Sequence, residues 1–382
     1  MKSSKMMRRV RCLSLALCLL LPCLLVSCGS PKGPIEYTEI GAPQAERYTE
    51  NMNARCPWDM IVYDGSLYVG GGDYDANAGP ADIWRYDAKT GEWSLDGTVP
   101  DEEVSRFYVM NDGTLSAPGI DPRDDWTFGN YYVQGTDGWE TVRTIPNAKH
   151  VFDIAEHGGA IYAGLGAEAG RSAIARSTDG GQTFEPIGLY KDGQEVDTAD
   201  MKWNRVYDLF TLGDGLYAAL FLYDGEAVTY DLYRLEGDAF VFDNQWYGKV
   251  SQVRYIGNIV GGKAQHRDRL YFTTGYLYVT TDMSDCKKIV FGEGEVVYDL
   301  CVVDDVLYAL SAVEQEDGTY RVSVRRNRGG EVDEFTECFY FSYEIPPLSL
   351  AAGEDQFYIG MGTILGGSSE KNGTILCVEY EP

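Results

Sequence analysis

The chain has 382 residues, of which 44% are hydrophobic, 13% aromatic and 24% charged, so it can bury a full core and is neither a disordered tail nor a disulfide-stapled miniprotein. Its 32 basic and 59 acidic residues give a formal net charge of -27, which would repel a polyphosphate backbone and excludes a general nucleic-acid-binding surface. The 44 glycines, 28 tyrosines and 14 prolines favour short strands joined by tight turns. We therefore expect an all-β protein.

The first residues have the pattern of an export signal. A basic segment over residues 1–11 precedes an apolar stretch over 12–26, which is shorter than the roughly 20 residues that cross a bilayer. Leu25-Val26-Ser27-Cys28 is similar to the bacterial lipobox, in which the signal is cleaved before a cysteine that then carries lipid. The resemblance implies a lipoprotein signal peptide over 1–27 and a lipid-anchored tether over 28–34. An exported bacterial lipoprotein, held at a membrane only through Cys28, is expected.

The remaining cysteines predict no metal site. They are scattered, with no CxxC spacing, which indicates neither a zinc site nor a dense disulfide framework. One or two disulfides remain an open alternative among Cys56, Cys286, Cys301, Cys338 and Cys377. We expect no cofactor, with a structural or channel cation such as calcium left open.

A repeat of about fifty residues runs through the rest of the chain. Each copy has a short apolar strand, a tight turn and a second strand centred on a hydrophobic pair, usually ending in tyrosine. The pairs are Leu67-Tyr68, Thr114-Leu115, Ile161-Tyr162, Leu216-Tyr217, Leu270-Tyr271, Leu307-Tyr308 and Phe357-Tyr358. Repeats of this length pack radially because one small sheet cannot bury both its faces. The sequence therefore predicts a single domain over 35–382, a seven-bladed β-propeller of four-stranded antiparallel blades.

The last repeat is one strand short. Its expected strands end at Tyr380, while a lone strand-like segment over Ile35–Ile40 precedes the first repeat. We expect this N-terminal strand to complete the last blade and close the ring.

One turn resembles a known repeat. Residues 177–184 match the Asp-box pattern of bacterial neuraminidase repeats at Ser177, Asp179, Gly181, Thr183 and Phe184, whereas residues 84–93 are more similar to a kelch-type or quinoprotein-type turn. The chain thus resembles the sialidase-like and kelch-like propellers. In that group the Asp-box is structural: it closes a hairpin between the third and fourth strands. The early F/Y-R-I-P motif of sialidases is absent.

A register of acidic residues marks the first strands. Eight positions before the hydrophobic residue of each second-strand pair, which is Leu115 in the second pair, the residues are Asp59, Phe107, Asp153, Asp208, Gly262, Asp299 and Ser349. Basic groups stand near the starts of the same strands, namely Arg55, Arg106, His150, Arg205 and Arg254. A ring of carboxylates and guanidiniums at the mouth of a central channel would follow. These groups either lock neighbouring blades together or form a ligand pocket, and the sequence leaves both interpretations open.

Tryptophans fall into two groups. Trp126, Trp203 and Trp246 lie on predicted long loops, where an indole could stack on a sugar ring or pack the loop down. Trp58, Trp84, Trp93 and Trp139 lie in or beside strands and are expected in the core.

Two functions compete. The chain has three histidines and no HExxH, GxSxG, Walker-type or dinucleotide-binding motif. Our first hypothesis is a non-enzymatic binding module for a glycan or an envelope or extracellular protein, which uses its long-loop face. The alternative is a glycosidase or polysaccharide lyase that acts on an anionic glycan through paired carboxylates at the channel mouth. If the aspartates are consumed by contacts between blades, the first hypothesis is favoured.

Overall fold

The described part of the chain folds into β-strands. The computed structural model describes residues 33–123, 125–245, 261–363 and 367–380, and every regular element in them is a β-strand. These ranges contain no apolar helix of membrane-spanning length. The all-β prediction is confirmed. The predicted signal over 1–27, Cys28, Trp246 and Arg254 lie outside the described residues.

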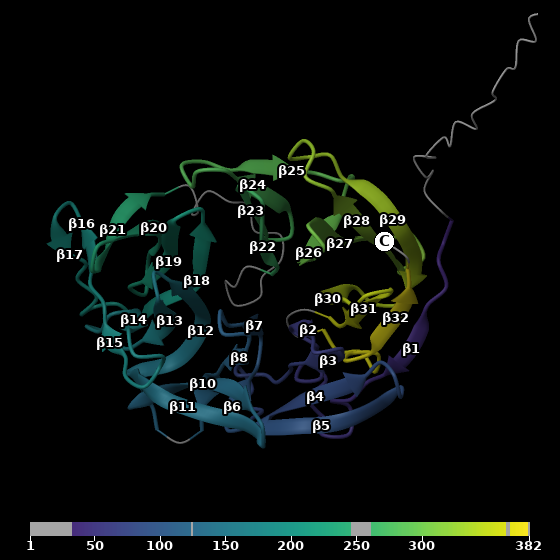
Figure 1. Ribbon diagram of the computed structural model, residues 1–382, viewed down its shortest axis with the longest axis horizontal. Helices are drawn as coiled ribbons and strands as arrows, with labels where there is room; N and C mark the ends of the chain where they lie inside the picture. Colours follow the sequence, from purple (N-terminus) through teal and green to yellow (C-terminus); the bar gives the residue numbers. More distant parts are fainter. Residues whose placement is uncertain (1–32, 124, 246–260, 364–366, 381–382) are drawn as a thin grey trace, which may run out of the picture.

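Five antiparallel sheets of four strands each form separate blades of a ring (Figure 1). The first two are β2 (Met60–Tyr63), β3 (Ser66–Val69), β4 (Ala81–Asp87) and β5 (Glu92–Val99), then β7 (Tyr108–Val109), β8 (Leu115–Pro118), β10 (Phe128–Gly135) and β11 (Gly138–Pro146). The next two are β22 (Lys263–His266), β23 (Arg269–Thr273), β24 (Leu277–Thr280) and β25 (Lys287–Ile289), then β26 (Val296–Val303), β27 (Val306–Glu314), β28 (Tyr320–Asn327) and β29 (Thr336–Tyr343). The last is β30 (Pro347–Ala352), β31 (Gln356–Met361), β32 (Ile375–Glu379) and β1 (Thr38–Gly41).

One twelve-stranded sheet fills the rest of the ring. Its first strands are β6 (Asp101–Glu103), β9 (Ile120–Pro122), β12 (Ala148–His157), β13 (Ala160–Ala167), β14 (Ile174–Ser177) and β15 (Glu185–Pro186). The others are β16 (Leu189–Lys191), β17 (Gln194–Glu195), β18 (Trp203–Leu212), β19 (Gly215–Tyr223), β20 (Val228–Glu236) and β21 (Ala239–Asn244).

The predicted count of seven separate blades is therefore wrong: five four-stranded sheets stand alone, and hydrogen bonds merge the other twelve strands between residues 101 and 244 into one sheet. The merger takes place where β13 pairs with β18, through Gly166 opposite Arg205 and Ala167 opposite Asn204. Gly164 permits the close approach, because a Cβ there would lie 2.7 Å from the carbonyl oxygen of Val206. The repeat in the sequence marks antiparallel hairpins but does not reveal this pairing.

The prediction that an N-terminal strand closes the ring is confirmed. β1 pairs antiparallel with β32, with Thr38 opposite Cys377 and Glu39 opposite Leu376. Just before β1, the Ile35 amide donates a 2.8 Å hydrogen bond to the Tyr340 carbonyl of β29. The start of the described chain thus contacts β29, the outer strand of one blade, and then forms β1, the outer strand of the next blade (Figure 1).

The core lies between successive sheets. The tyrosines of the second-strand pairs are buried, with exposures of 6% or less at Tyr68, Tyr162, Tyr217, Tyr271, Tyr308 and Tyr358. For example, Tyr358 of β31 packs with Met60 and Leu67 of the next sheet around the ring. Each pair therefore joins two sheets through buried apolar area, which is the main source of stability.

The antiparallel strands give the ring two different faces. Residues 70–80, 168–173, 224–227 and the described parts of 119–127 and 362–374 join second to third strands, and they lie on the side where first strands begin. We call this side the long-loop face. The opposite short-turn face carries the hairpins that join first to second strands, such as residues 64–65.

Candidate functional site

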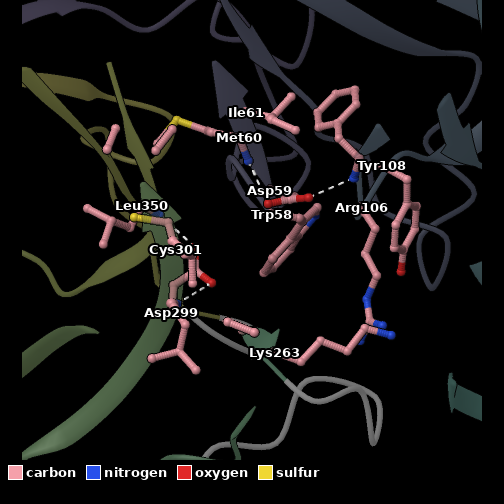
Figure 2. A pocket seen from close by; sticks show the side chains of 18 of the residues that line it. Trp58, Asp59, Met60, Ile61, Arg106, Tyr108, Lys263, Asp299, Cys301 and Leu350 are labelled. Atoms are coloured by element: carbon pink, nitrogen blue, oxygen red, sulfur yellow. Dashed lines mark hydrogen bonds between the residues drawn. The ribbon is translucent and has the colours of Figure 1, made fainter. Parts of the chain in front are cut away.

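A cavity of about 500 Å³ lies inside the ring, between the first strands (Figure 2). One part of its wall is charged and the other is apolar. The charged and polar part includes Asp59, Arg106, Tyr108, Lys263 and Asp299, and the apolar part includes Met60, Ile61, Leu300, Leu348 and Leu350.

The first-strand aspartates are placed by irregularities in the sheets. In the pairing of first with second strands, the register shifts directly before Asp153, Asp208 and Asp299. A bulge of this kind turns a side chain out of the regular alternation. The predicted common register therefore has a common structural cause.

Three of these aspartates make the same contact between strands. Asp59 accepts hydrogen bonds from the amides of Met60, at 2.8 Å, and of Phe107 on the next repeat, at 2.7 Å. Asp153 does the same with Ile154 (3.0 Å) and Leu209 (2.6 Å), and Asp299 with Leu300 (2.8 Å) and Leu350 (2.7 Å). Each carboxylate therefore fastens its own strand to the first strand of the following repeat.

Cations complete the fully buried part of the ring. Arg106 lies 3.1 Å from Asp153 and 2.8 Å from Asp208, and both carboxylates have 0% exposure. The Lys263 ammonium donates to Asp153 and, at 2.7 Å, to the Leu209 carbonyl. Burial alone would lower the pKa of Arg106, but Asp153 and Asp208 raise it above its usual value. Burial lowers the pKa of Lys263, although the same carboxylates oppose this.

Sequence reasoning missed two residues of the cavity. Lys263 follows Gly262, which takes the place of an aspartate in the first-strand register. A basic residue next to this position could have indicated that Lys263 lies in the cavity. Trp58 was expected in the core but lines the cavity, where its indole nitrogen donates a 2.8 Å hydrogen bond to the Gly72 carbonyl. Because Trp58 directly precedes Asp59, its place in the sequence could have indicated that it also lies at the cavity.

A second cluster lies around Arg205 on the long-loop face. Three rings surround the guanidinium carbon, with centroid distances of 4.9 Å to Trp203, 5.7 Å to Phe152 and 5.7 Å to Tyr207. Within the described part of the chain, Arg205 donates one hydrogen bond, at 2.6 Å to the Tyr207 hydroxyl, and forms no ion pair within 4 Å. Trp203 is 42% exposed. This half-buried guanidinium keeps further N–H donors for a ligand.

His150 belongs to the same cluster. Its ring stacks on Phe152 at 5.0 Å and lies 5.7 Å from the Tyr74 ring. Burial, together with the positive charges of Arg205 and Lys149, holds the pKa of His150 well below its usual value. A neutral imidazole therefore faces the aromatic cluster at neutral pH.

A buried acidic strand is connected to this cluster through β9, because Ile120 of β9 lies opposite both Glu103 and His150. The sequence did not predict this strand. Asp101, Glu102 and Glu103 of β6 are all buried. Burial raises the pKa of Asp101 to about 6, that of Glu102 to about 7, and that of Glu103 well above its usual value. Gly72 makes the packing feasible, since its φ is +109° and a Cβ would lie 2.3 Å from the Glu102 carbonyl oxygen.

The other predicted site residues lie apart from both clusters. Arg55 is buried and donates to the carbonyls of Tyr48 (2.7 Å) and Thr49 (2.9 Å), so it holds a loop in place. Trp126 is 48% exposed, and the Lys149 ammonium lies 4.0 Å from its ring centroid. The predicted single ring of charges is thus divided: Arg106 joins Asp153 and Asp208, while Arg205 joins His150 and Trp203.

The Asp-box-like octet forms the turn between β14 and β15. Asp179 accepts hydrogen bonds from the Thr183 amide at 2.9 Å and its hydroxyl at 2.6 Å, and the Gly181 amide donates to Ser177 at 2.8 Å. Bonds from Thr183 hold the pKa of Asp179 down at about 2. Phe184 is buried against Tyr131. These contacts stabilise a hairpin.

The sequence left disulfides and a bound cation as open alternatives. Among the described residues, no disulfide joins Cys56, Cys286, Cys301, Cys338 or Cys377. Over the described ranges, no three or more His, Cys, Asp or Glu side chains are grouped as metal ligands.

Comparisons with solved structures identify the fold as a β-propeller. The WD40 β-propeller domain of Doa1 matches with a TM-score of 0.53 and 11% identity, over 91% of this chain and 98% of that one. Sqt1 of Saccharomyces cerevisiae matches with a TM-score of 0.46 and 10% identity, over 92% and 100%. BamB from Moraxella catarrhalis matches with a TM-score of 0.41 and 12% identity, over 84% of each chain.

Sequence comparison adds no family to this. No protein-family model matches the chain, and no curated protein resembles it significantly. At such low identities the structural similarity shows a shared architecture and not a shared ligand.

Proposed function

We propose that this propeller is a non-enzymatic binding module of the bacterial envelope, tethered by lipid on Cys28, which holds a glycan or a protein segment on its long-loop face. The main observation behind the proposal is that the first-strand aspartates bind other groups of the ring. Asp59, Asp153 and Asp299 bind amides of the following repeat, and Asp208 pairs with Arg106. These carboxylates serve the ring itself.

The same contacts weigh against the alternative of a glycosidase or lyase at the channel mouth. Glycoside cleavage needs two carboxyl groups about 5–10 Å apart that can exchange protons with the substrate. Asp153 and Asp208, which flank Arg106 most closely, have no exposure at all. A substrate cannot reach them without opening the ring.

The cluster around Arg205 supports the choice of face. It combines an exposed indole at Trp203 with a guanidinium that forms no ion pair within the described ranges, on the side that carries the longer loops. Flat aromatic surface next to a directed polar donor is the usual composition of binding hot spots. Loops on a rigid scaffold commonly carry recognition.

The proposal is tested by screening the purified chain on glycan and peptide arrays, with hydrolysis of each bound glycan measured in parallel. We expect binding without turnover, and loss of binding in Arg205→Ala and Trp203→Ala. The matched control is Arg267→Ala, since Arg267 is an arginine of the short-turn face with a half-exposed side chain.

Two results would count against the proposal. Catalytic turnover would restore the enzyme hypothesis, and binding that is unaffected by both long-loop variants would place the ligand elsewhere.

A further inference from the structure

We propose that the channel cavity is a second binding site, which takes a primary ammonium group on an aliphatic stem and holds the ammonium at the carboxylate of Asp59. This site is separate from the cluster around Arg205 and does not depend on a ligand there. The inference comes from a comparison that the repeat itself provides, between Asp59 and Asp153.

At Asp153 the protein already binds an ammonium group in this manner. The carboxylate is fixed by the amides of Ile154 and Leu209, and the Lys263 ammonium then donates both to Asp153 and to the carbonyl of Leu209. A first-strand aspartate and the backbone of the following repeat thus form an ammonium site. Lys263 occupies this one from within the chain.

Asp59 has the same fixed geometry without the cation. The amides of Met60 and Phe107 hold its two oxygens, in the places that Ile154 and Leu209 take at Asp153. A carboxylate accepts about four hydrogen bonds, so these two leave acceptor capacity. Among the described residues no cation lies within 4 Å of Asp59, and its side chain lines the cavity.

The surroundings of Asp59 suit an alkyl ammonium ion. Figure 2 shows the Trp58 indole projecting into the cavity beside Asp59, and its bond to the Gly72 carbonyl fixes the ring there. A cation above an indole face gains electrostatic attraction. The apolar side chains of Met60, Ile61 and Leu350 line the same cavity and would cover an aliphatic stem.

Charge favours the same class of ligand. The chain carries a net charge of -27, which raises the local concentration of cations around it. Arg106 and Lys263 also line the cavity, but Asp153 and Asp208 offset their charges. The negative charge of Asp59 therefore remains available to an added ammonium group.

The test is a calorimetric titration of the full chain with n-butylammonium and with n-butanol, its neutral counterpart. We expect the ammonium to bind about tenfold more tightly than the alcohol or better, and Asp59→Asn to abolish this preference. Asp64→Asn is the matched control, because Asp64 is an exposed acid on a hairpin and asparagine tolerates its φ of +47°. Trp58→Leu should weaken ammonium binding about threefold without affecting the alcohol, and it tests the site should Asp59→Asn not fold.

A third probe, acetyl-Gly-Lys-Gly-amide, separates the two sources of an ammonium group. Binding of both n-butylammonium and the tripeptide assigns the site to a lysine side chain of a partner. Binding of n-butylammonium alone assigns it to a free amine. The proposal is overturned if neither probe binds saturably, if butanol binds equally well, or if both Asp59→Asn and Trp58→Leu keep the affinity of the unaltered chain.

Discussion

Arg106 and Arg205 start from the same prediction and end in opposite environments. Both stand near the beginning of a first strand, and the sequence places both in one ring of charges. In the structure Arg106 is 6% exposed and contacts two fully buried carboxylates. Arg205 is half-buried, lies among three aromatic rings and forms no ion pair within the described ranges.

The difference separates a structural arginine from a binding one. A guanidinium that donates to buried carboxylates holds strands together, because its removal would leave those carboxylates buried without a counter-charge. A guanidinium that keeps donors at a surface, with its flat face against aromatic rings, is prepared for an external partner. Exposure and partners, and not position in the repeat, decide the role.

The largest expected effect on stability comes from replacing Arg106, inside the ring. Arg106→Met should lower the free energy of unfolding by about 3–5 kcal/mol, because Asp153 and Asp208 would be left as buried charges without their guanidinium. Urea unfolding followed by tryptophan fluorescence measures this change. A loss of less than about 1 kcal/mol would mean that the cluster is open to water, and the contrast with Arg205 would fail.

The next largest effect is expected from the buried acidic strand β6, which should make the free energy of unfolding depend on pH. Burial raises the pKa of Asp101 to about 6 from the ordinary 3.8. Because the folded state holds this proton more tightly, its contribution is complete below pH 3.8 and is lost as the pH rises through about 6. Stability should therefore fall by about 2–3 kcal/mol across this window on account of Asp101.

Asp101→Asn removes the titrating group while keeping a polar side chain. Urea unfolding at pH 4 and pH 7 should show a smaller decrease in this variant than in the unaltered chain. Equal decreases in both proteins would contradict the assignment to Asp101.

Much of the ring could be predicted because the sequence patterns that mark its strands span only a few neighbouring residues. A leucine or isoleucine next to tyrosine, after a tight turn, marks a second strand whose burial depends only on the neighbouring sheet. Closure by β1 followed from counting strands in the last repeat. The aspartate register was visible because the bulges before Asp153, Asp208 and Asp299 recur at one position.

The rest depends on contacts between distant segments. The twelve-stranded sheet forms because Gly164 lets β18 approach β13, and no periodicity in the sequence encodes that approach. The burial of Asp101, Glu102 and Glu103 violates the general rule that acidic residues are exposed. The division of the predicted charge ring depends on Arg106 and Lys263, which both contact Asp153 from other repeats.

A smaller effect is expected from the contact that the aspartates make between repeats. Asp299→Ala should lose about 1–3 kcal/mol, since it leaves the buried amide of Leu350 without its acceptor. Asp285→Ala is the control, because Asp285 is exposed and its carboxylate, among the described residues, accepts a hydrogen bond only from the amide of Cys286 directly after it. Thermal unfolding of both variants measures the difference. Similar melting temperatures for the two would show that the contact between strands adds little.

The smallest effect on stability is expected at Arg205, and it completes the contrast with Arg106. Arg205→Met keeps the aliphatic stem among the rings but removes the guanidinium, so the free energy of unfolding should change by less than about 1 kcal/mol. Removing this positive charge should raise the pKa of His150, which Arg205 now helps to depress. NMR titration of the imidazole checks this point, and array binding checks the ligand. If Arg205→Met instead destabilises the chain as much as Arg106→Met does, both arginines are structural and the long-loop face loses its strongest binding candidate.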